Sequence, residues 1–106
     1  MRVSFDQGAP VPLREALAQH DVSTAYERGW SKLKNGELLD AAEREGFEVF
    51  VTTDSRLRYQ QKLAARPIAV VCLLFTSWPR IKRVTSSIAE VVAACSPGSY
   101  VEVPIP

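Results

Sequence analysis

The sequence predicts an α/β fold in which a central, mostly parallel sheet of about five strands lies between two layers of helices. Short apolar runs alternate along the chain with segments whose apolar residues repeat at helical spacing, a pattern typical of β-α-β units. The run 67–75, PIAVVCLLF, is apolar throughout, as expected for a strand buried on both faces of a parallel sheet. We therefore expect a three-layer α/β/α sandwich that forms a single domain over residues 1–106.

Five segments are expected to form strands because they are rich in apolar and β-branched residues. They are residues 2–6, 21–26, 48–53, 67–75 and 99–106. Pro104 and Pro106 cannot donate a ladder hydrogen bond, so the last strand is expected at an edge of the sheet or just past one.

Four segments are expected to form helices. They are residues 10–20, 36–45, 55–65 and 76–95. Asn35 is a preferred residue for the N-cap of the second helix, and Gly46 is suited to ending it. The third helix has few apolar residues, of which Leu57 and Leu63 are the main ones.

Composition describes an ordinary globular protein without a bulk electrostatic partner. The formal net charge is +1 over 106 residues, so contacts with nucleic acid would have to come from local clusters of basic residues. No segment approaches the roughly 18 apolar residues of a membrane span, and the N-terminus lacks an apolar signal region. We expect a cytoplasmic protein with no membrane partner, in which Cys72 and Cys95 are reduced. The only histidine, His20, leaves no zinc motif.

Three carboxylates are expected at the edge of the sheet where the strands end. Asp6 follows the first strand, Asp54 follows the third, and Glu37 opens the helix between the second and the third. In parallel sheets ligands bind outside the carboxyl ends of the strands. Converging carboxylates repel one another unless a cation lies between them, and Mg²⁺ binds such sparse acidic sets with several waters retained.

Each of these acids also has a purely structural explanation. Asp54 is a good N-cap for a helix starting at Ser55. Glu37 in a first helical turn is favoured by the helix dipole, and Asp6 before Gln7 and Gly8 can start a turn. The sequence leaves both interpretations open for all three residues.

The same residues carry a resemblance to a known family. Asp6 ends the first strand and is followed by Gln7 and nearby prolines. A second strand with small and β-branched residues and a further helix come next. The third strand then ends in Thr52-Thr53-Asp54. This pattern, over roughly residues 1–75, resembles a compact PIN-like bacterial family related to the PIN-domain ribonuclease toxins. Two positions depart from it: the second helix opens with Asn35-Gly36-Glu37 where the family has Asp-Glu-Glu, and Arg56 stands where a further acid is usual.

The resemblance implies a metal-dependent endoribonuclease, and a toxin of a toxin–antitoxin pair. It implies that Asp6, Glu37 and Asp54 are catalytic and hold Mg²⁺ or Mn²⁺, with Thr52 or Thr53 assisting through a hydroxyl group. RNA, a cognate antitoxin and a second copy of the chain are the partners it implies. The two departures favour an alternative, a PIN-like module with weakened chemistry that binds RNA or a protein.

Basic and aromatic residues are candidates for the RNA contact. The basic candidates are Arg56, Arg58, Lys62, Arg80, Lys82 and Arg83. They are equally compatible with a solvated surface, which is the usual role of such charges. Trp30, Trp78 and Tyr59 could stack on unpaired bases, or they could belong to the core.

Overall fold

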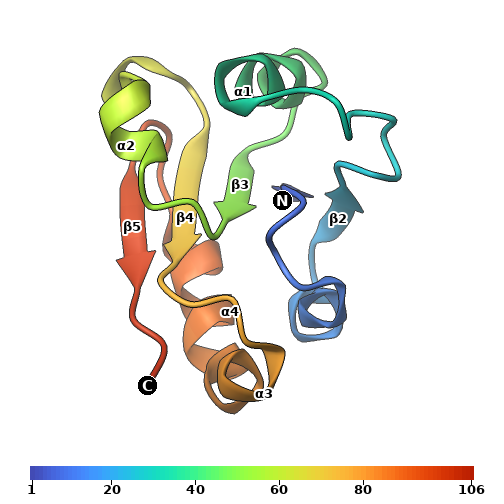
Figure 1. The fold of residues 1–106 in the computed structure, drawn as a ribbon, viewed down its shortest axis with the longest axis vertical. Coiled ribbons are helices and arrows are strands. Elements are labelled where there is room, and N and C mark those ends of the chain that lie inside the picture. Colours follow the sequence, from blue (N-terminus) through green and yellow to red (C-terminus); the bar gives the residue numbers. More distant parts are fainter.

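The computed structural model describes residues 1–106 and contains a five-stranded sheet between two layers of helices (Figure 1). The strands are β1 (Arg2–Phe5), β2 (Asp21–Thr24), β3 (Val49–Thr52), β4 (Ala69–Leu73) and β5 (Tyr100–Val103). Their order is β2-β1-β3-β4-β5, and every pair of neighbours is parallel. The predicted α/β class and all five strands are confirmed, β5 lies at an edge, and the sheet is parallel throughout rather than mostly.

Helices cover both faces of the sheet, as predicted. The helical elements are η1 (Val11–Leu17), α1 (Asn35–Arg44), α2 (Leu57–Gln60), η2 (Leu63–Ala65), α3 (Trp78–Ile81), η3 (Lys82–Val84) and α4 (Thr85–Ala94). The helices α1 and α2 share one apolar cluster with the sheet, and η1, α3 and α4 share the other. In Figure 1, α1 and α2 lie together at the top of the view, and α4 lies behind the strands.

Alternation of side chains along the strands produces these two clusters. Phe5 and Val51 face the cluster that contains Ile88 of α4, whereas Phe50 and Val70 face the cluster that contains the leucines of α1 and α2. Every residue of β4 is buried, as expected for this part of the apolar run 67–75, whereas Leu74 and Phe75 at its end are exposed. Burying one such large apolar side chain contributes about 1.5–3 kcal/mol, so the central strands are the most firmly held part of the sheet.

Two of the expected helices differ in their first turns. Residues 11–17 form a 3₁₀ helix rather than an α-helix; Pro10 and Pro12 remove two backbone donors from this short segment. Lys34, not Asn35, is the N-cap of α1. The Asn35 side chain instead donates a hydrogen bond to Oε1 of Gln60, so this residue joins α1 to α2.

The other two expected helices are interrupted. The segment 55–65 breaks at Gln61, which has extended backbone angles, because two leucines six positions apart cannot form a continuous apolar stripe. The segment 76–95 consists of α3, η3 and α4, with Val84 out of helical conformation before α4. Two adjacent β-branched residues, Val84 and Thr85, lower the helix propensity at that junction.

One connection between strands differs in hand from the other three. The α2 segment joins β3 to β4 across one face, and α4 joins β4 to β5 across the opposite face, although both connections step in the same direction along the sheet. Two such connections have opposite hands. Because about 98% of crossovers between parallel strands share one hand, the β4-to-β5 connection is the unusual one.

The two cysteines are free thiols, one buried in β4 and the other just after α4. Burial raises the pKa of both Cys72 and Cys95, so the thiol form predominates over the reactive thiolate. None of the helices combines the length and apolar content needed to cross a membrane.

Candidate functional site

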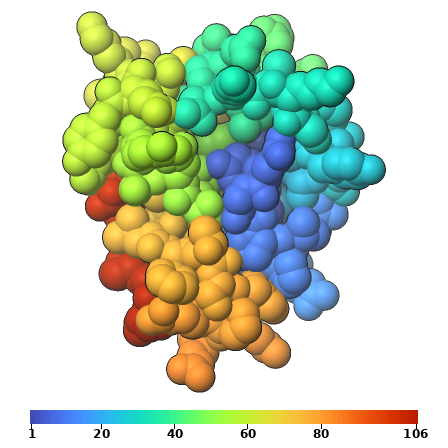
Figure 2. Space-filling view, in the orientation of Figure 1, coloured from blue at the N-terminus to red at the C-terminus, as the bar shows by residue number.

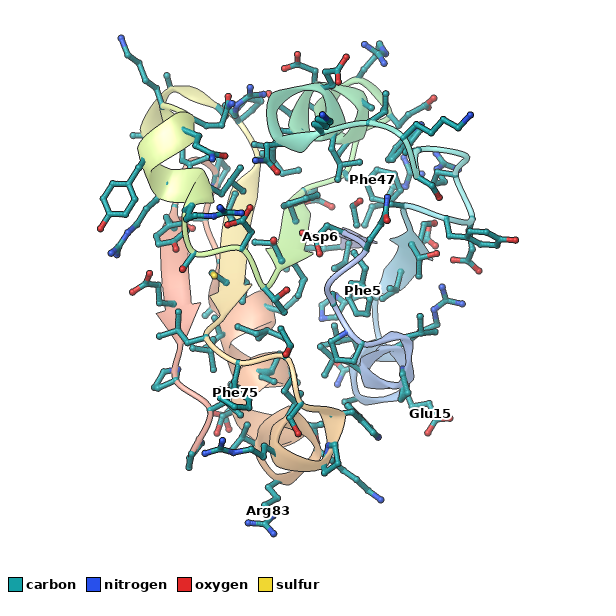
Figure 3. The ribbon with its side chains drawn as sticks, in the orientation of Figure 1. Phe5, Asp6, Glu15, Phe47, Phe75 and Arg83 are labelled. Carbon is teal, nitrogen blue, oxygen red and sulfur yellow. The ribbon has the colours of Figure 1, made fainter.

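The strand order places a topological switch point between β1 and β3. The chain leaves β1 to form β2 on one side and returns to form β3 on the other, and in open parallel sheets ligands bind outside the carboxyl ends of the strands at such a reversal. A cavity of about 330 Å³ lies there. It is lined by Asp6, Gln7, Gly8, Leu33, Lys34, Asn35, Leu38, Asp54 and Arg56. Figure 3 shows Asp6 at the centre of the molecule, beside the end of β3.

Asp6 is held by three donors. Its Oδ1 atom accepts hydrogen bonds from the backbone N–H groups of Gly8 at 2.9 Å and Ala9 at 3.1 Å. Its Oδ2 atom accepts a hydrogen bond from the hydroxyl group of Thr52. These contacts fix the carboxylate at the start of the turn after β1, so the structural explanation of Asp6 and its place in the cavity both hold.

The Thr52 hydroxyl connects the two aspartates. It donates to Asp6 and accepts a hydrogen bond from the backbone N–H of Asp54 at 3.0 Å. Thr52 is fully buried, so this hydroxyl positions the carboxylate and does not reach solvent. Thr53 is half-buried and lies against Gly8.

The environment of Asp6 favours its protonated form. Burial raises the pKa of this carboxyl group, and the nearby Asp54 raises it further, against the hydrogen bonds from Thr52, Gly8 and Ala9, which lower it. A carboxylate that is desolvated beside another carboxylate gains from a bound cation. Asp6 is therefore the group of the site whose charge is least compensated by the protein.

Asp54 is not the predicted N-cap, but it shapes the turn before α2 and lines the cavity. Its Oδ1 atom accepts hydrogen bonds from the backbone N–H of Arg56 at 3.0 Å and from Nε of the same residue at 3.3 Å. Its backbone carbonyl accepts from Leu57 N–H, so the residue shapes the turn that leads into α2 without being the N-cap, which is Arg56. Its side chain is 24% exposed and presents a carboxylate to the cavity.

Glu37 does not join the two aspartates. Its Oε1 atom accepts a hydrogen bond from the backbone N–H of Lys34 at 3.3 Å, which turns the side chain back onto the first turn of α1, and it does not line the cavity. No group of three acidic, histidine or cysteine side chains in the structure could hold a metal ion. The expectation that three carboxylates converge is thus corrected to two, Asp6 and Asp54.

The structure adds Gly8 and Lys34 to the predicted site. A Cβ atom at Gly8 would overlap Oγ1 of Thr53, so a larger residue would force the Thr53 side chain to shift. The position of Gly8 two residues after Asp6 in the sequence is a signal for the turn after β1. Lys34 lines the cavity beside Asn35, and no sequence pattern singles out this lysine among the charges of its loop.

The donor set fits a divalent cation that is completed by waters and by substrate. Mg²⁺ is commonly bound through one or two carboxylates together with phosphate oxygens, and Asp6 and Asp54 supply that number. They do not form a cage made entirely of protein ligands. Lys34 and Arg56 at the same cavity reduce the negative potential and are suited to contacting a phosphate group.

The six basic candidates separate into two groups. Arg56, Arg58 and Lys62 lie on or beside α2, whereas Arg80, Lys82 and Arg83 belong to α3 and η3 across the sheet. Figure 3 shows Arg83 pointing away from the body of the molecule at the bottom of the view. The structure thus brings only the first group to the side of the candidate site.

Among the aromatic candidates, Tyr59 is the exposed one. Trp30 is half-buried and packs edge-on against Phe47, with ring centroids 6.0 Å apart, and Trp78 packs against the apolar cluster of α4. The Tyr59 side chain is 75% exposed.

Comparison with family models, curated proteins and solved structures finds no match to this chain.

Proposed function

We propose that the chain is a metal-dependent endoribonuclease of the PIN-like type, in which Asp6 and Asp54 hold Mg²⁺ or Mn²⁺. The observation that carries the proposal is the convergence of these two carboxylates on one cavity at the reversal point of the sheet. A cation held there would activate a water molecule and stabilise the charge that develops on a phosphodiester during cleavage.

The residues of the chain have separate roles in this proposal. Asp6 is the principal ligand, because it is desolvated and held rigidly by Thr52, Gly8 and Ala9. Asp54 is the second ligand, through the Oδ2 atom that is not engaged by Arg56. Lys34 and Arg56 bind non-bridging oxygens of the substrate phosphate by charge-assisted hydrogen bonds.

Calorimetric titration with Mn²⁺ tests the proposal without a choice of substrate. The wild-type protein is expected to bind one ion per chain, and Asp6→Asn and Asp54→Asn are each expected to abolish saturable binding. Asp21→Asn is the matched control, because Asp21 is exposed at the start of β2, at the opposite edge of the sheet. Absence of binding to the wild-type protein at millimolar Mn²⁺, or equal binding by all four proteins, would refute the metal site.

A second function is favoured by the ion pair between Arg56 and Asp54. This guanidinium group lies 3.3 Å from the Asp54 carboxylate and compensates its charge, as expected of a module that binds RNA without cleaving it. Such a module would bind single-stranded RNA equally well with EDTA or Mn²⁺ present. RNA that remains intact with Mn²⁺ and is bound equally in both buffers would favour this function over the nuclease.

The resemblance extends the proposal to a toxin of a toxin–antitoxin pair. Induced expression in a bacterial host would then arrest growth, and expression of Asp6→Asn at the same level would not. Equal growth of both cultures would remove the toxin role and leave the nuclease proposal to the calorimetric test.

A further inference from the structure

A second hollow lies beside the candidate site, between α2 and the edge strand β5. Its volume is about 550 Å³, larger than that of the cavity at Asp6. It is lined by Arg58, Tyr59, Gln60, Gln61, Lys62, Leu63, Ala64 and Tyr100. We call this hollow the α2–β5 groove. Figure 2 shows the α2 segment in yellow-green on the surface, with β5 in red beneath it.

The lining of the groove is cationic, with one paired and one unpaired basic side chain. Its lining contains two cationic side chains, Arg58 and Lys62, and no acidic one. Lys62 is exposed and forms no ion pair within the chain. Glu102 lies next to the groove and holds Nη1 of Arg58 at 3.0 Å, which fixes the orientation of the guanidinium group.

The groove also presents aromatic faces. The Arg58 guanidinium lies 4.6 Å from the centroid of the Tyr59 ring, and the Tyr59 ring is itself largely exposed. Tyr100 lines another part of the groove and donates a hydrogen bond to Glu102 at 3.0 Å. A cationic groove with aromatic side chains is the arrangement by which proteins bind single strands, because unpaired bases stack on the rings while the cations contact the backbone.

Gln60 connects the groove to the candidate site. It lines the α2–β5 groove, and its Oε1 atom accepts the hydrogen bond from Asn35, which lines the cavity at Asp6. Arg56 lines that cavity and directly precedes α2. A strand that left the cavity along α2 would therefore enter the groove without crossing the core of the protein.

We propose that the α2–β5 groove binds a single-stranded polynucleotide and seats the nucleotides that flank the phosphodiester at Asp6 and Asp54, with Tyr59 stacking on a base and Arg58 and Lys62 contacting phosphates. The inference deepens the proposed function and rests on it for the position of the cleaved bond. Binding in the groove is independent of the metal. A duplex is not the expected ligand, because its bases are already paired and stacked.

Fluorescence anisotropy with labelled single strands of about 12 nucleotides, within the usual site size, tests the groove. The measurement is made in EDTA, so that no cleavage occurs. Tyr59→Ala is expected to weaken binding about tenfold, and Lys62→Ala about threefold with a smaller salt dependence. The matched control for Lys62→Ala is Lys82→Ala, on η3 at the other face of the sheet, and it is expected to bind like the wild-type protein.

The experiment distinguishes RNA from DNA as the bound strand, and it distinguishes failure of the groove from failure of the metal site. Tighter binding of RNA than of DNA assigns the groove to RNA, and equal binding assigns it to single strands in general. Four results would overturn the proposal that the groove binds single strands. They are unchanged affinity in both Tyr59→Ala and Lys62→Ala, no binding by the wild-type protein, a preference for duplex, and displacement by inorganic polyphosphate at equal phosphate concentration. Mn²⁺ titration of Tyr59→Ala distinguishes the failures: the variant is expected to bind the metal like the wild-type protein even where RNA affinity is lost.

Discussion

Replacement of Thr52 by valine is expected to destabilise the protein by about 3 kcal/mol at neutral pH. The substitution keeps the shape of the buried side chain and removes the hydroxyl that donates to Asp6 and accepts from Asp54 N–H. A hydrogen bond to a charged group contributes about 1.5–3 kcal/mol, and a half-buried N–H left without an acceptor costs about 1 kcal/mol. Thr52→Ser, which keeps the hydroxyl and loses one methyl group, is expected to cost about 1 kcal/mol.

The destabilisation is expected to depend on pH. The Thr52 hydrogen bond lowers the Asp6 pKa, so its removal raises the folded-state pKa further above the unfolded value. Below the unfolded pKa, Asp6 is protonated in both states and this part of the loss is absent; the loss grows as pH rises and is complete above the folded-state pKa.

Urea unfolding of wild type, Thr52→Val and Thr52→Ser, each with and without Asp6→Asn, measures these quantities. The double-mutant cycle is expected to give a coupling of about 1–2 kcal/mol between Thr52 and Asp6. Equal losses for valine and serine, or a valine loss that is the same with and without the Asp6 carboxylate, would refute the reasoning that this hydroxyl supports the charge.

Three further changes have defined outcomes. The raised Asp6 pKa makes the wild-type protein lose stability as pH rises from the unfolded-state to the folded-state pKa of this group. Asp6→Asn is expected to remove this fall in the free energy of unfolding. Urea midpoints that run parallel for the two proteins across that pH range would contradict this. Gly8→Ala is expected to lower the free energy of unfolding by about 1–3 kcal/mol through overlap with Thr53, and to weaken Mn²⁺ binding. Gly29→Ala, at an open turn of positive φ, is expected to lower only the melting temperature. Arg56→Ala removes the cation paired with Asp54. It is expected to raise the affinity for Mn²⁺ about twofold to fivefold, the range of exposed ion pairs, and to weaken RNA binding. A lower Mn²⁺ affinity in calorimetry would show instead that Arg56 supports the site.

The sheet could be predicted from the sequence because its signal is local in each strand. The apolar runs mark β1, β3 and β4 directly, and the prolines mark β5 as an edge strand. The positions of Asp6 and Asp54 at one rim then follow from parallel pairing alone. The breaks in the helices at Gln61 and Val84 were not predicted, although their signals are local: the wide spacing of Leu57 and Leu63, and the β-branched pair Val84 and Thr85.

The composition of the site was harder to predict than its location. Glu37 stands in the first turn of α1, where sequence position places it near the rim, but the direction of its side chain is decided by the unpaired N–H of Lys34. The α2–β5 groove depends on the strand order, which brings residues near 60 beside Tyr100. No pattern along the chain encodes such a long-range neighbour.

The unusual hand of the β4-to-β5 connection has a consequence for the order in which the protein folds. The first four strands can form by repeated winding in one sense, whereas α4 has to pack on the opposite face before β5 can pair with β4. Strand pairings that require a long loop to close form slowly, so β5 is expected to join last and to exchange its amide hydrogens as a separate cooperative unit. The groove beside Tyr100 is therefore completed only at the final step, after the rim that carries Asp6 and Asp54 has formed.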